Sequence, residues 1–124
     1  MNLTFGVLAN GWPSAGFYPP TDVRRVVGGF LNADVGTCHA TIERCLDGIE
    51  QVRRGRVPQW QRTGDAFSVV IKPESCHLRQ YDPPPGPGFV GECRLSHEEL
   101  IDVLRAWQAH LIAAGWPPVA GGDG

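Results

Sequence analysis

The sequence predicts an α+β domain in which an antiparallel sheet of four to five strands, connected as a meander, carries two amphipathic helices on one face. Two observations lead to this fold class. Apolar residues recur with a helical period in two segments, and they alternate with a period of two in the short segments between them. The 124 residues suit one domain. We assign residues 1–118 to that domain and residues 119–124 to a frayed C-terminal tail.

The N-terminal third contains the least regular patterns. Asn2–Leu8 alternates loosely and predicts a strand, and the Gly- and Pro-rich segment Asn10–Pro20 predicts a loop. We expect the loop aromatics to cover the core or an open sheet edge, with an exposed anchor for a partner as the alternative; they are Trp12, Phe17 and Tyr18. Asp22–Leu31 fits a helical stripe, but Gly28-Gly29 weakens any helix, so a broken strand stays open for this segment.

A clear helix is predicted from about Cys38 to Arg54. Its apolar positions share one helical face and are Cys38, Ile42, Cys45, Ile49 and Val52. Thr37 is placed to cap the start, and Gly55 stands where a C′ glycine belongs.

The period then changes to two, which predicts strands. We expect β-segments at Gln59–Arg62, Ala66–Ile71, Ser75–Tyr81 and Phe89–Leu95, joined by short connections. One connection, Asp82–Gly88 (DPPPGPG), is rich in proline and predicts a rigid loop. It is either a plain connector or a recognition element in polyproline-like form.

The last element carries the strongest local signal. Ser96 and Glu99 have the spacing of a capping box, and the apolar residues that follow recur at helical intervals. Gly115 and the proline pair after it predict an end near Ala114.

Composition excludes several classes of function. The net charge of −2 argues against a general nucleic-acid binder, which needs a basic face. There is no run of about 18 apolar residues to cross a membrane, and residues 1–10 lack the pattern of a signal peptide. We therefore expect a cytoplasmic protein whose four cysteines are reduced.

The cysteine and histidine spacings do not favour a chemical site. Cys38 and Cys45 are too far apart along one helix to share a metal ion, and Cys76 and His77 point to opposite faces of a strand. We expect buried thiols and surface imidazoles, and we predict no catalytic residue, no metal and no cofactor. The alternative is a small enzyme or metal-binding regulator that uses Cys76, His77 or Cys93.

Acidic residues supply the candidate partner-binding surface. Glu43, Asp47 and Glu50 line the polar face of the first predicted helix. They form either an ordinary solvated face with one Glu50–Arg54 pair or a dock for a basic partner. With Tyr81 and Asp82, at the entrance to the proline-rich loop, they are the partner-binding residues that we predict.

Several of these patterns occur together in one order. The first helix ends in I-x-x-V-x-x-G at residues 49–55, and a short strand with Trp60 follows. Next come Gly64-Asp65-Ala66-Phe67 and, after further β-structure, L-S-x-E-E-L-x-x-x-L-x-x-W at residues 95–107. Over about residues 38–116 the chain resembles small bacterial immunity proteins of contact-dependent growth inhibition and related polymorphic toxin systems.

This resemblance implies a cytoplasmic binding protein that is not an enzyme. Such proteins neutralise a cognate toxin domain, often a nuclease at the C-terminus of a larger toxin, by occluding its active site. Their interfaces differ from pair to pair, so the resemblance assigns no further site residues. A structural or adaptor protein without a toxin partner is the remaining alternative.

Overall fold

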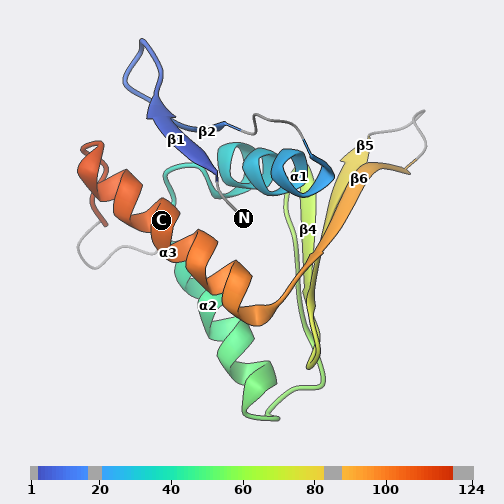
Figure 1. Cartoon of the computed structure of the whole chain (residues 1–124). Helices are drawn as coiled ribbons and strands as arrows, with labels where there is room; N and C mark the ends of the chain where they lie inside the picture. The colour runs from blue at the N-terminus through green and yellow to red at the C-terminus, as the bar shows by residue number, and fades with distance from the viewer. Residues whose placement is uncertain (1–2, 17–20, 83–87, 119–124) are drawn as a thin grey trace.

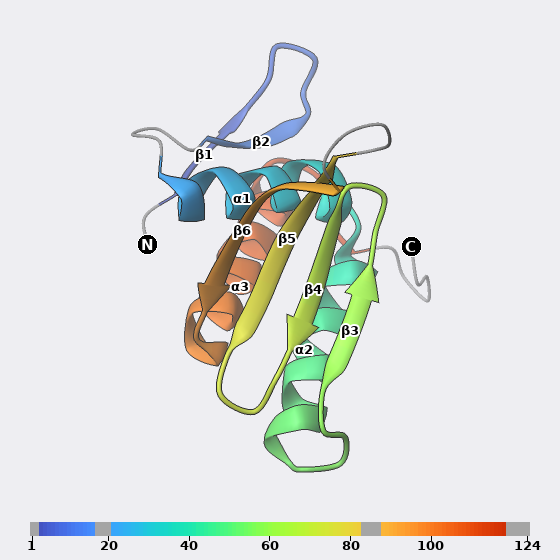
Figure 2. The ribbon, with the colours of Figure 1, turned by 90° about the vertical axis from the view of Figure 1, so that its right-hand side faces the viewer.

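A computed structural model describes residues 3–16, 21–82 and 88–118. Within these ranges the chain forms a four-stranded sheet, three helices and a separate two-stranded hairpin. Figure 2 looks onto the sheet and shows the helices behind it, so one sheet face is covered and the other is open. The predicted α+β class and the antiparallel meander are confirmed.

The meander follows the chain order β3-β4-β5-β6. Its strands are β3 (Trp60–Thr63), β4 (Phe67–Ile71), β5 (Cys76–Asp82) and β6 (Gly88–Leu95). Val69 pairs with Leu78, and Leu78 pairs with Cys93, so buried side chains from three strands line up on the covered face. The register between β5 and β6 shifts at Gln80 and Tyr81.

The two predicted amphipathic helices are α2 (His39–Arg53) and α3 (His97–Ala113). Gly55 and Gly115 follow their C-termini with φ of 70° and 93°, as their predicted capping role requires. The capping box at the start of α3 is also present. The predicted Thr37 cap of α2 is wrong: the N-cap residue is Cys38, and its side chain makes no capping hydrogen bond.

Asp22–Leu31, for which the sequence allowed either a helix or a broken strand, forms a third helix. It comprises α1 (Asp22–Phe30), capped by Thr21, and continues as a π-helical turn η1 (Leu31–Val35). Its glycines explain the ambiguity, because a Cβ added at Gly29 would lie 2.8 Å from Cζ of Phe67. The glycine that weakens the helical pattern is therefore what lets α1 approach β4.

A buried carboxylate joins this N-terminal helix to the meander. Oδ1 and Oδ2 of Asp34 accept hydrogen bonds from the backbone N–H groups of Ala66 (3.1 Å) and Phe67 (3.0 Å). A side chain at Gly64 would collide with this carboxylate. The sequence Gly64-Ala66-Phe67, noted above as a motif, thus forms the turn that receives Asp34.

The N-terminal strand does not join the main sheet. β1 (Thr4–Val7) pairs antiparallel with β2 (Pro13–Gly16), and the two make their own hairpin. The expected loop at Asn10–Pro20 is therefore wrong where it overlaps β2, and residues 17–20 lie outside the described part. Figure 1 shows the hairpin extending beyond the helices at one end of the molecule. The predicted tail, residues 119–124, also lies outside the described part.

Candidate functional site

The three acidic residues predicted on the first helix all lie on α2. Glu43 and Asp47 are exposed and Glu50 is partly exposed. Most of their charge is already engaged within the chain. Oε1 of Glu43 accepts hydrogen bonds from Arg105 Nη1 (3.2 Å) and Gln108 Nε2 (3.0 Å) on α3, and Glu50 forms the expected pair with Arg54.

Asp47 has a weaker partner. Its Oδ1 accepts a long hydrogen bond of 3.4 Å from Nε2 of Gln51, one helical turn away. A Gln–Asp pair at this helical spacing contributes about 0.2–0.5 kcal/mol to helix stability. Asp47 is therefore the least neutralised of the three carboxylates and the one most available to a basic partner.

The other two predicted residues lie at the end of β5. Tyr81 is 39% exposed and lies two and four residues from Arg79 and His77, so it shares their side of the strand, the open face of the sheet. Asp82 pairs with Gly88 across to β6. Because α2 packs on the covered face and Tyr81 lies on the open face, the acidic residues of α2 and Tyr81 are on opposite sides of the sheet and do not make one site. The side chain of Asp82 lies outside the described part.

The open face carries a small charged group beside Tyr81. Oε2 of Glu92 lies 3.2 Å from Nε2 of His77 and 3.3 Å from Nε of Arg79, which face it across the β5–β6 ladder. These contacts tie the two strands together on their solvent side.

The cysteines behave as a structural group with one exception. All four are free, and burial raises the pKa of three of them, to about 11 for Cys45, about 12 for Cys76 and about 11 for Cys93. Cys38 is partly exposed at the start of α2, so the expectation of a buried thiol is wrong for this residue. A hydrogen bond with the Thr41 side chain lowers the pKa of Cys38.

Three imidazoles are tied to backbone carbonyls. Nε2 donates in each case: from His39 to Trp116 (2.6 Å), from His97 to Lys72 (2.6 Å), and from His110 to Gly6 (2.8 Å). The expectation of surface imidazoles is wrong for His39 and His97, which are buried. These rings join segments that are distant in the sequence.

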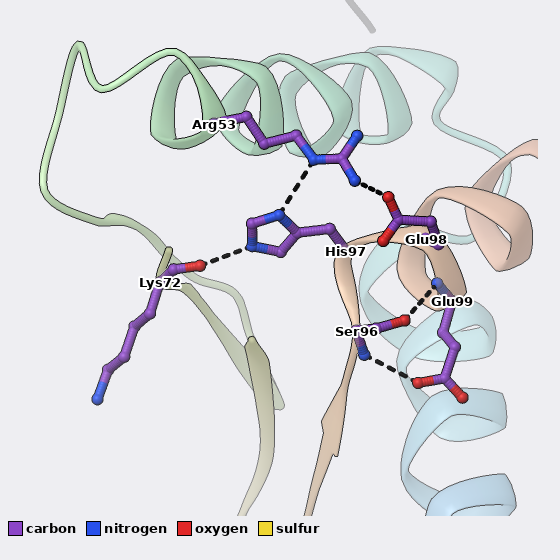
Figure 3. A network of polar contacts seen from close by, with 6 residues as sticks. All are labelled: Arg53, Lys72, Ser96, His97, Glu98 and Glu99. Carbon is purple, nitrogen blue, oxygen red and sulfur yellow. Dashed lines mark hydrogen bonds and ion pairs between the residues drawn. The ribbon is translucent and has the colours of Figure 1, made fainter. Parts of the chain in front are cut away.

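His97 is the centre of the network drawn in Figure 3. Its Nδ1 accepts a hydrogen bond of 3.2 Å from Nε of Arg53, and Arg53 also pairs with Glu98. Since Nε2 donates to the Lys72 carbonyl, both ring nitrogens are used. The ring joins the end of α2, the β4–β5 turn and the start of α3. Among the described residues, no group of three or more His, Cys, Asp or Glu side chains is placed to hold a metal ion.

One surface feature was predicted only in part: an exposed Trp12 was the alternative to a core position, whereas Val7 and Leu8 were not named. Three large apolar side chains at the turn of the β1–β2 hairpin are exposed: Val7 (54%), Leu8 (53%) and Trp12 (46%). The expectation that Trp12 covers the core is wrong, while Phe17 and Tyr18 lie outside the described residues. A sequence signal was available, because residues 1–21 contain no Asp, Glu, Lys or Arg.

In the described part of the chain, no helix combines the length and apolar character needed to cross a membrane. Comparison with models of protein families, with curated proteins and with solved structures finds no match to this chain.

Proposed function

We propose that this chain is an immunity protein that binds a cognate toxin domain in the cytoplasm and blocks its active site. The motifs at residues 49–55, 64–67 and 95–107 support this proposal through their resemblance to such proteins. Each of these motifs has a structural role in the described fold, as a helix end, a turn or a helix cap.

The observation that carries the proposal is a group of large apolar side chains exposed at the turn of a hairpin that contains no Asp, Glu, Lys or Arg. Val7, Leu8 and Trp12 project from a hairpin that extends beyond the helices (Figure 1). Aromatic and apolar residues free of charge are typical of the centre of a protein–protein interface. A binding protein needs such a surface, whereas a protein without partners gains nothing from exposing it.

A nuclease is the toxin class that we favour. Among the predicted acidic residues of α2, Glu43 and Glu50 are paired with Arg105 and Arg54. Exposed Asp47 is therefore the carboxylate best placed to attract a basic surface and accelerate association. Nucleases present basic surfaces because they bind a polyanionic substrate.

Co-expression tests the proposal. The toxin domain encoded next to this chain should stop growth when it is produced alone, and this chain should restore growth when it is produced with it. A catalytically inactive toxin domain should co-purify with the chain. Co-purification without rescue would indicate an adaptor, and the absence of both effects would rule out the immunity function.

A further inference from the structure

The turn of the β1–β2 hairpin displays apolar side chains on a defined backbone. We call Val7, Leu8 and Trp12 the hairpin tip. Leu8 N–H donates to the Trp12 carbonyl (2.7 Å), and Gly11 N–H donates to the Leu8 carbonyl (2.9 Å). Gly11 has a φ of 89°, which an L side chain rarely adopts. The tip is therefore an ordered turn.

The base of the hairpin is fixed by side chains from two helical segments. Oδ1 of Asn32 accepts from Ala15 N–H (2.7 Å), and Nδ2 of Asn32 donates to the Ala15 carbonyl (2.8 Å), as a neighbouring strand would. On the other strand, His110 of α3 donates to the Gly6 carbonyl. The Phe5 ring packs edge-on against Trp107 at 5.2 Å. These contacts fix the direction in which the hairpin extends.

The tip itself rests on the segment after α3. The rings of Trp12 and Trp116 stack with their centroids 4.8 Å apart, and Nε1 of Trp116 donates to the Gly11 carbonyl at 3.4 Å. Buried His39 holds the Trp116 carbonyl in turn. A tip that is ordered before binding loses little conformational entropy when a partner covers it.

The charge distribution defines the chemistry of that partner. Residues 3–16 and residues 106–118 contain no Asp, Glu, Lys or Arg, so neither the hairpin nor the segment on which its tip rests offers a counter-ion of these types. A charge that the partner buried against this end would be unpaired, at a cost of several kcal/mol. The lack of Lys and Arg also removes the attraction that holds a protein on an anionic membrane.

The exposed area favours a concave partner over a second copy of this chain. The exposed fractions of the three side chains correspond to about 300 Å² in total. A stable interface needs about 800 Å² from each partner, so two tips in contact fall well short. A cleft that also encloses the sides of the projecting hairpin can supply the missing area.

On the basis of the proposed function, we propose that the hairpin tip is the anchor of the interface and inserts into an uncharged, apolar cleft of the toxin domain. Buried apolar anchors provide most of the affinity of many interfaces, while charged rims mainly set association rates and salt dependence. In this complex, the acidic residues of α2 would act on the association rate and the tip on dissociation.

Calorimetric titration with the catalytically inactive toxin domain tests this anchor. Leu8→Asp and Trp12→Ser should each raise Kd at least about tenfold, through faster dissociation. Gln59→Asp is the matched control, because it adds the same charge at an exposed position in the connection between α2 and β3. This connection lies at the end of the molecule opposite the hairpin in both ribbon views. Its Kd should stay within about twofold of the wild-type value.

The possible outcomes distinguish a failure of the proposed anchor from a failure of the proposed function. If the wild type fails to bind the toxin domain, the proposed function falls, and the anchor falls with it. If the wild type binds and the two tip variants bind equally well, the anchor alone is wrong. A melting temperature equal to that of the wild type shows that a variant is folded. We expect this for Leu8→Asp, because the Leu8 side chain lies outside the core.

Two further measurements test whether the hairpin tip binds a second copy of this chain or a lipid surface instead of a protein cleft. A concentration-dependent dimer in sedimentation that Leu8→Asp abolishes would mean that the tip binds a second copy. Co-sedimentation with phosphatidylcholine vesicles that Trp12→Ser abolishes would mean that it binds a lipid surface. Either result would overturn insertion into a protein cleft.

Discussion

At the scale of single residues, the cysteines differ in reactivity for a physical reason. Burial disfavours the thiolate of Cys45, Cys76 and Cys93 and raises their pKa values to about 11 or 12. Cys38 is partly exposed, and its hydrogen bond with Thr41 favours the thiolate. Because the thiolate is the reactive form, these four side chains should respond very differently to an alkylating agent.

We predict that iodoacetamide at pH 8 labels Cys38 alone in the native protein and all four cysteines in urea. Mass spectrometry of the intact chain counts the labels, and Cys38→Ser should leave the native protein unlabelled. Rapid labelling of Cys76 or Cys93 in the native state would contradict this prediction. It would also favour the alternative function, a small enzyme that depends on cysteine and histidine side chains.

Gly48 shows how a close contact determines a residue that the helical pattern leaves unexplained. A Cβ at this position of α2 would collide with the ring of Trp60 on β3. Alanine is favoured over glycine in a helix by about 1 kcal/mol. Here, the collision should outweigh that gain.

We therefore predict that Gly48→Ala lowers the free energy of unfolding by about 1–3 kcal/mol, the usual cost of overpacking. Urea unfolding followed by circular dichroism measures it. The same substitution in a Trp60→Leu background should be neutral or stabilising, because the obstructing ring is gone. An equal loss in both backgrounds would show that contact with Trp60 is not the cause.

At the scale of elements, the capping box of α3 links stability to pH. The Ser96 N–H donates to Oε1 of Glu99 at 2.9 Å, and this hydrogen bond lowers the pKa of Glu99 from its ordinary value of 4.5. A carboxylate whose pKa is lower in the folded state stabilises the protein above its unfolded pKa. That contribution is lost as the pH falls through the folded pKa.

We predict that Glu99→Gln changes stability little at pH 7 and flattens its fall below about pH 4.5. The amide oxygen of Gln keeps an acceptor for the Ser96 N–H but does not titrate. As a positive control, Ser96→Ala should cost about 1 kcal/mol at pH 7. Urea unfolding at pH values from 3 to 7 measures both, and equal pH dependence in the wild type and Glu99→Gln would refute the linkage.

Elements with their own local signals were predictable from the sequence. The capping box, the helical stripes of α2 and α3, and the alternating strands each predict their structure within a few neighbouring residues. The N-terminal third was not predictable in this way, because α1 depends on Gly29 approaching Phe67 and the hairpin depends on Asn32. Such contacts join residues that the sequence separates, so a pattern along the chain cannot reveal them.

The same distinction applies to the candidate site. Helical spacing predicted the acidic positions of α2, but the contacts of Glu43 with Arg105 and Gln108 of α3 depend on helix packing. The position of Trp12 likewise depends on its stacking against Trp116, which is distant in the sequence. The charge-free stretch at residues 1–21 was visible in the sequence but does not by itself distinguish a buried strand from an exposed tip.

At the scale of the whole molecule, charged and uncharged surfaces occupy different regions. The charged residues lie in residues 22–105 and at Asp123, while the hairpin and its supporting segment are uncharged. Figure 1 places this hairpin at one end of a two-layer body. The arrangement combines a projecting apolar anchor with charged flanks, which suits the occlusion of a site on a larger partner.

Stoichiometric inhibition of the toxin is the most direct test of the proposed neutralising function. The purified chain is titrated into an activity assay of the adjacent toxin domain, at a toxin concentration well above Kd. We predict that toxin activity falls linearly and vanishes at one chain per toxin domain. With Leu8→Asp at the same concentrations, part of the toxin activity should remain. Full toxin activity in the presence of excess wild-type chain would contradict the account.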